Sequence, residues 1–149
     1  MCSSDLFVTG GTGVDTINFG TLDLTATGAA PVQVQAENIQ QAASSTGVFI
    51  SGNAVFDNGG QNGIIDFPQI ANTFQGTVTA LGGSNNVAIA ASSNLILDDI
   101  TAGALDLSVA GVRTVTQNAG SLIVVSSITD VDAPNSTVTL TQAPNDFNN

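Results

Sequence analysis

The chain has 149 residues, of which 42% are hydrophobic, 9% are charged and 5% are aromatic. This composition is typical of a chain that can bury the core of one ordinary domain, and it excludes an intrinsically disordered chain. Twelve acidic residues and a single base, Arg113, give a formal net charge of −11. That charge repels nucleic-acid phosphates and anionic lipid surfaces. The absence of histidine also excludes a Ser-His-Asp triad, and with one cysteine it excludes a zinc site.

The first six residues, Met1–Leu6, are predicted to be a non-native leader. The peptide CSSDL is the translation of TGC-TCT-TCC-GAT-CT, the end of a widely used sequencing adapter, so we interpret this segment as read-through. Residues 7–20 are predicted to form a separate Gly-rich turn that leads into a strand over Thr16–Phe19.

The Gly-rich segment Gly10–Asn18, GGTGVDTIN, fits the nonapeptide pattern G-G-x-G-x-D-x-U-x and resembles the calcium-dependent β-rolls of RTX proteins. The resemblance implies Gly11, Gly13 and Asp15 as candidate calcium ligands, because glycines permit tight turns while Asp and backbone carbonyls supply hard oxygen atoms. Each ion in such a roll lies between consecutive turns, so one copy supplies half a cage. The competing interpretation is a Gly-rich turn with no metal.

Short β-rich runs follow one another along residues 21–149, separated by Gly, Asn, Asp and Ser. Several alternate apolar with polar residues, which places one face of each strand in a core and the other in water. The stretch Ala36–Ser44 is the exception: we expect a helical turn or two there, inside an insertion that forms a loop. The predicted strands are Thr21–Thr27, Val32–Ala36, Val48–Ser51, Gly63–Phe67, Thr77–Leu81, Val87–Ala90, Asn94–Leu97, Ala104–Val109, Ser121–Ser126 and Thr137–Thr141.

A sequence block recurs within this region. The segment Ile65–Phe74 returns as Val138–Phe147, and the offset is constant because Phe67 matches Leu140 just as Phe74 matches Phe147. We call this spacing the block offset. Such self-similarity indicates a repeat architecture, and we place block joins near residues 74 and 147. Small and branched aliphatic residues suit stacked rungs of roughly 20 to 25 residues, about six in all.

We therefore predict an all-β, right-handed, single-stranded parallel β-helix over residues 21–149. An antiparallel β-sandwich is the alternative.

Paired acidic residues raise the possibility of an enzyme, because parallel β-helices also host polysaccharide lyases and hydrolases. Asp98 and Asp99 are adjacent, and Asp130 and Asp132 would share one face of an extended strand. A glycosidase needs two carboxylates at a defined separation, one with a raised pKa. Acidic sugars also require basic groups, and the sequence has no His or Lys and only one Arg, so we expect the protein not to be an enzyme.

Four further segments carry a family resemblance. They are NTFQGTV (Asn72–Val78), NLILDDITAGALDLSVAG (Asn94–Gly111), TQNAGSLIV (Thr116–Val124) and TLTQAPNDF (Thr139–Phe147). Together they resemble the filamentous-haemagglutinin-like repeats of giant bacterial surface proteins, over most of Thr21–Asn149. In that family such blocks form right-handed parallel β-helices in the passengers of long adhesins exported by two-partner secretion.

The resemblance implies a structural shaft segment of a secreted or surface-exposed bacterial adhesin. Its expected partners are carbohydrate or protein surface ligands and the neighbouring β-helix rungs of the same polypeptide, with no nucleic acid, no membrane insertion and no cofactor unless calcium. The first alternative is a calcium-binding RTX-like module. The second is a fragment of a β-helical polysaccharide lyase or hydrolase.

Overall fold

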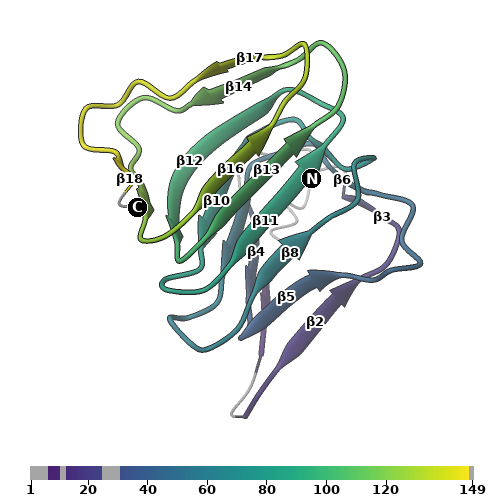
Figure 1. Ribbon diagram of the computed structural model, residues 1–149. Helices are drawn as coiled ribbons and strands as arrows, with labels where there is room; N and C mark the ends of the chain where they lie inside the picture. The colour runs from purple at the N-terminus through teal and green to yellow at the C-terminus, as the bar shows by residue number, and fades with distance from the viewer. Residues whose placement is uncertain (1–6, 11–12, 25–30, 148–149) are drawn as a thin grey trace.

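Eighteen short β-strands wind into one coil in the computed structural model, which describes residues 7–10, 13–24 and 31–147. The leader predicted over Met1–Leu6 and the end of the strand predicted over Thr21–Thr27 lie outside the described residues. All the strand pairings in these ranges are parallel, and each joins a strand to one a single turn further along the chain (Figure 1). No residue in these ranges is helical. The predicted parallel β-helix is therefore confirmed, and the β-sandwich, which needs antiparallel neighbours, is wrong.

The strands fall on three faces of the coil, and face B, with one strand per turn, counts about six turns. Figure 1 shows the stack from β2 at its purple end to β17 at its yellow end. Face A consists of β1 (Phe7–Thr9), β4 (Val32–Gln35), β7 (Ala54–Asp57), β10 (Thr77–Leu81), β12 (Leu95–Ala102), β14 (Thr114–Gln117) and β17 (Thr137–Thr139). Face B consists of β2 (Thr16–Phe19), β5 (Asn38–Gln41), β8 (Ile65–Phe67), β11 (Val87–Ala91), β13 (Leu105–Val109) and β16 (Thr129–Asp132). Face C consists of β3 (Leu22–Leu24), β6 (Val48–Ile50) and β9 (Thr73–Phe74).

The cross-section of the coil changes at β12, the longest strand. The first half of β12 pairs with β14, whereas its second half pairs with β15 (Ile123–Val125), which in turn pairs with β18 (Asp146–Phe147). The register between β10 and β12 shifts at the same place, where Val78 faces Leu97 but Ala80 faces Ile100. The one extra residue in β12 bends the strand, as a β-bulge does. Face A therefore divides in two above β12, whereas the strands of face C stop at β9.

The core is a set of inward columns in which residues one turn apart lie on top of each other. On face B, Phe67 aligns with Ile89, Ile89 with Leu107 and Leu107 with Val131. A cluster of four phenylalanines, Phe19, Phe56, Phe67 and Phe74, fills the lower part, and the rings of Phe56 and Phe67 have their centroids 4.5 Å apart. All four side chains are at most 7% exposed. Stacking of like apolar residues thus closes the interior of the coil.

The length of a turn varies, and this decides where the repeated block falls. Ile65 aligns with Val87, Val87 with Leu105 and Leu105 with Thr129, so three turns from Ile65 end at Thr129. The counterpart of Ile65 at the block offset, Val138, lies further along the chain in β17 on face A. The block offset therefore spans three turns and part of a fourth, and equivalent residues of the two blocks occupy different faces.

The helical turn expected within residues 36–44 is wrong. This stretch contains β5, which lies between β2 and β8 in the middle of face B. Its Ile39 side chain is fully buried. Backbone hydrogen bonds to strands on both sides and burial of Ile39 outweigh the helix propensity of Ala, Glu and Gln. The segment is a rung of the coil and not an inserted loop.

Candidate functional site

Two corners of the coil are each closed by a pair of side-chain amides, and we call each pair an amide clamp. In the first clamp, Gln41 Nε2 donates to Asn72 Oδ1 at 2.7 Å, and Asn72 Nδ2 donates to Gln41 Oε1 at 3.0 Å. In the second clamp, Gln117 Nε2 donates to Asn145 Oδ1 and Asn145 Nδ2 donates to Gln117 Oε1, both at 2.7 Å. Asn72 and Asn145 are equivalent at the block offset, whereas Gln41 and Gln117 are not, so the repeat preserves the position of the asparagine and the turn below supplies the glutamine.

Each clamp also holds the backbone of its corner. Asn72 Oδ1 accepts the Val48 N–H at 2.8 Å, and Asn145 Oδ1 accepts the Ile123 N–H at 3.1 Å. Buried backbone groups at a turn need such partners because no neighbouring strand supplies them there. Each clamp therefore holds together the corner of the coil at which it lies.

The structure brings one of the three predicted calcium ligands to a pocket. Gly11 lies outside the described residues. Gly13 is exposed, has a φ of 130° and does not line the pocket. Asp15 lies just before β2 and lines a depression of about 230 Å³ at the corner between faces A and B.

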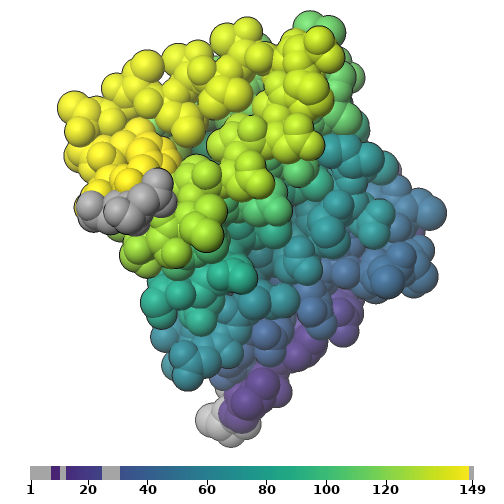
Figure 2. Space-filling view, in the orientation of Figure 1, coloured from purple at the N-terminus to yellow at the C-terminus, as the bar shows by residue number. Residues whose placement is uncertain are grey.

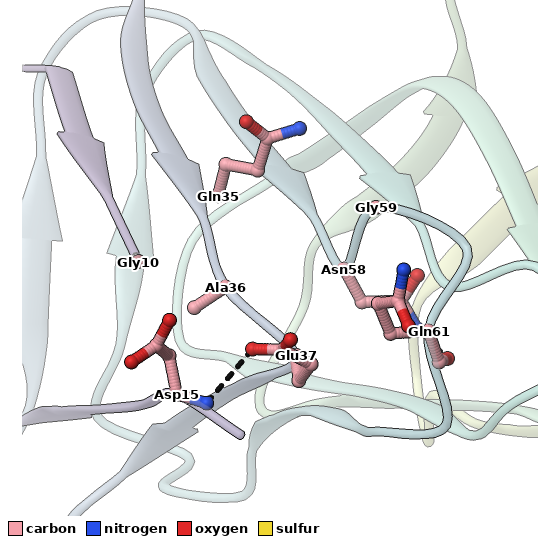
Figure 3. Close-up of a pocket in the computed structure, with 8 residues that line it drawn as sticks. All are labelled: Gly10, Asp15, Gln35, Ala36, Glu37, Asn58, Gly59 and Gln61. Carbon is pink, nitrogen blue, oxygen red and sulfur yellow. Dashed lines mark hydrogen bonds between the residues drawn. The ribbon is translucent and has the colours of Figure 1, made fainter. Parts of the chain in front are cut away.

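Figure 3 shows this pocket, which is lined mostly by polar side chains from three successive turns. Glu37 lies beside Asp15, and its Oε2 accepts the Asp15 N–H at 2.8 Å. The remaining lining residues are Gly10, Gln35, Ala36, Asn58, Gly59 and Gln61. Sequence reasoning missed Glu37 because it lies a full turn of the coil after Asp15, and only the register of β2 on β5 makes them neighbours.

One oxygen atom in this pocket is left unsatisfied. Asp15 Oδ2 is buried and has no hydrogen-bond partner among the described residues. A Cβ atom at Gly10 would lie 2.5 Å from this oxygen, so only glycine leaves room for the carboxylate there. A buried polar atom without a partner is costly. Oxygen atoms from carboxylates and amides are the ligands that calcium prefers, although the described residues contain no group of three or more His, Cys, Asp or Glu suited to a metal.

A second acidic feature runs along the outside of face B. Asp66 aligns with Ala88, Ala88 with Asp106 and Asp106 with Asp130. We call this the acidic column. Because Ala88 is small, a depression of about 160 Å³ lies between Asp66 and Asp106, and Ser108 also lines it.

One carboxyl group of the acidic column, that of Asp66, has a shifted pKa. Partial burial, and then the nearby negative charge of Asp106, raise the pKa of Asp66 above its usual value of 3.8. Both causes disfavour the ionised form. Nothing in the sequence spacing identifies this pair, because its members are two turns apart along the chain and become close only through two successive strand registers.

The acidic pairs singled out in the sequence have different positions. Asp98 accepts hydrogen bonds from Thr79 Oγ1 at 3.3 Å and Asn118 Nδ2 at 3.1 Å. Asp99 Oδ1 accepts the Leu122 N–H at 2.9 Å. These two carboxylates hold the bend in β12.

Asp130 and Asp132, by contrast, both lie exposed on the outer face of β16, as alternation predicted. The only base, Arg113, donates from Nε to the Ser92 carbonyl oxygen at 2.7 Å and from Nη1 to the Val112 carbonyl oxygen at 3.3 Å. It thus binds backbone oxygens of a corner in these contacts.

Within the ranges that the structure describes, there is no helix long and apolar enough to cross a membrane.

The family described as repeats of unknown function (DUF5649) matches residues 4–81 and again residues 84–149. The first matched segment begins within the predicted leader, and the two segments together cover nearly the whole chain. No curated protein and no solved structure matches the chain. The chain therefore belongs to this family of repeats, as a β-helical repeat protein that contains two copies.

Proposed function

We propose that this protein is a structural shaft segment of a large secreted or surface-exposed bacterial adhesin, and that it is a structural and binding module and not an enzyme. The observation that carries the proposal is the continuity of face A, whose parallel ladder runs from β1 in the first copy to β17 in the second. A coil in which each copy continues the ladder of the previous one lengthens in proportion to the number of copies.

The outer surface suits such a role. In Figure 2 the residues advance in bands from purple to yellow along one direction, because each turn contacts mainly the turns before and after it. Outward residues of face B include the acidic column, which keeps that face hydrated and opposes lateral aggregation. The resemblance to filamentous-haemagglutinin-like repeats supports export to the bacterial outer surface, with the sides of the shaft presented to carbohydrate or protein ligands.

Labelling of intact source bacteria with an antibody raised against residues 31–147 tests the location. We expect labelling of intact cells that does not increase after permeabilisation. Labelling that requires permeabilisation would contradict the adhesin role. Release of reducing sugars from acidic polysaccharides, lost in Asp66→Asn, would contradict the assignment as a non-enzyme.

Calcium binding is a second candidate, favoured by the unpartnered Asp15 Oδ2 beside Glu37. A calcium ion there would neutralise the buried carboxylate oxygen and join the first two turns. Calcium should raise the melting temperature of the full chain, and Asp15→Asn should abolish that increase. Asp130→Asn, on the exposed outer face of β16, is the matched control and should keep it. Equal calcium responses in Asp15→Asn and the unmodified protein would exclude this site.

A further inference from the structure

The last turn of the coil ends in residues that are core residues in the first copy. Ile65 is 0% exposed and Phe74 is 1% exposed. At the block offset, Val138 is 42% exposed and Phe147 is 37% exposed. Residues of the same chemical type at the same place in the repeat are thus buried in one copy and open in the other.

The difference does not come from the local backbone. Strand β9 pairs with β6 so that Phe74 aligns with Ile50, and β18 pairs with β15 so that Phe147 aligns with Val125. The second amide clamp repeats the first with the same bonds, as described above. Phe147 therefore sits on the turn below it in the same way as Phe74 does. What differs is the turn above.

The second copy covers the end of the first through a short serine step, Ser92 and Ser93. The Ser92 N–H donates to the Asn72 carbonyl oxygen at 2.8 Å. The Phe74 N–H donates to Ser93 Oγ at 3.1 Å. Both serines belong to the segment matched as the second copy. The junction between the two copies is thus a defined interface, made of this serine step above Asn72 and Phe74 and of the strand ladders beside it.

We infer that the end formed by β16, β17 and β18 is a docking surface for a further copy of the same repeat, seated as the second copy sits on the first. The inference rests on the proposed shaft function and specifies how the shaft grows. The occupant is a tandem copy of the repeat, because the interface within this chain is already made by one copy on another. Leu140, Val138 and Phe147 become core residues in the longer coil.

The geometry also fixes how a further copy is oriented. Because the block offset spans three turns and part of a fourth, the first clamp lies between faces B and C, whereas the second lies on the divided face A. Each added copy is therefore rotated about the coil axis, relative to the copy before it, by the same part of a turn. Surface features specific to the repeat, such as its outward acidic residues, therefore wind around the shaft instead of lining one side.

Thiol accessibility in a lengthened chain tests the inference. Phe74 and Phe147 are equivalent, so residues 1–147 followed directly by a second copy of residues 75–149 reproduce the natural junction. All variants carry Cys2→Ser, and Val138→Cys supplies the reporter. We expect a thiol reagent to modify this cysteine at least about tenfold more slowly in the lengthened chain than in the original one, because protected sites react only on local opening.

Thr139→Cys is the matched control, since Thr139 is the next residue of the same strand and aligns with Thr116 on the outer face. Its counterpart Asp66 is only partly buried, so the reaction rate at this position should fall far less than that of Val138→Cys. A small-angle scattering measurement should also give an increase in the longest dimension of about 15 Å, for three turns and part of a fourth at about 4.8 Å each.

The inference is wrong if the thiol reagent modifies the cysteine of Val138→Cys at the same rate in the lengthened and the original chain. This holds whether the added copy is unfolded or folds separately. The inference is also wrong if the cysteine of Val138→Cys reacts more slowly only at high protein concentration, where separate chains associate, and not in the lengthened chain. The surface-labelling experiment is independent of these results, so a failed junction and a failed adhesin role are distinguishable.

Discussion

Replacement of the clamp asparagines by alanine gives a sharp test of the structure, because the same change can be made twice in different environments. Asn72 is fully buried, whereas its counterpart Asn145 is partly exposed on the last turn. Both use the side-chain oxygen to accept a backbone N–H, from Val48 and Ile123 respectively. We expect Asn72→Ala to be much more destabilising than Asn145→Ala.

The magnitude follows from the bonds that are lost. In Asn72→Ala the Val48 N–H loses its partner inside the coil, which costs about 1–3 kcal/mol. Gln41 keeps its bonds to Ser45 Oγ and to the Gln69 N–H, so its loss is partial. With the small cavity that remains, the free energy of unfolding should fall by about 2–4 kcal/mol. In Asn145→Ala water can replace the lost bonds, and the cost should be about 1 kcal/mol or less.

Urea unfolding followed by circular dichroism measures both costs. The two substitutions change the unfolded chain equally, so the difference between them reports on the folded state. The m-value should be unchanged, because the same surface is exposed on unfolding. A double-mutant cycle of Asn72→Ala with Gln41→Ala should show coupling between these two residues, since each loses bonds to the other. If Asn72→Ala and Asn145→Ala lower the free energy of unfolding equally, the first clamp is not buried more deeply than the second, and the reasoning is wrong.

Two further predictions concern face B and the corner beside it. The pKa of Asp66 is raised in the folded protein, mainly by burial and then by Asp106. The protonated Asp66 carboxyl therefore stabilises the folded protein below the unfolded pKa of 3.8, and this stabilisation is lost as the pH rises through the folded pKa. Asp66→Asn should therefore gain stability relative to the unmodified protein at pH 7 but not at pH 3, as measured by urea unfolding at both pH values; a pH-independent difference would contradict the shift. Gly63→Ala should cost about 3 kcal/mol because the added Cβ would overlap the Glu37 carbonyl oxygen. Gly20→Ala has open space and should change stability by less than about 0.5 kcal/mol in the same assay, and equal effects of the two alanines would show that the corner at Glu37 is not tightly packed.

Strands with clear alternation were predicted well from the sequence. The boundaries of Thr77–Leu81 agree with the structure, and those of 87–90 and 104–109 differ from it by a single position. Strands without a strong apolar signal were missed, among them β5, β14 and β16. The β5 sequence NIQQ carries one apolar residue, so only the strands on both sides identify it as a rung. Tertiary pairing overrides weak local preference in such a strand.

The functional features could be foreseen only in part. Asp15 was a candidate from its motif, but its neighbour Glu37 was not, and Gly13 does not reach the pocket. Asp98 and Asp99 were visible in the sequence as adjacent carboxylates, but not their partners Asn118 and Leu122 on the next turn. The pair with the perturbed titration, Asp66 and Asp106, has no sequence signature because a rung on the coil separates its members.

The sequence by itself determined that this chain is a coil of short parallel strands with two copies of one block, because apolar alternation, branched aliphatic residues and the recurring block are all patterns along the chain. The tertiary structure decided the register, and with it the faces on which the copies lie, the clamp partners and the acidic neighbours. The physical reason is that turns differ in length: the turn from Ile39 to Ile65 takes more residues than the turn from Val87 to Leu105. With turns of unequal length, spacing along the chain does not give position around the axis, and only the hydrogen-bonded ladder fixes which side chains meet.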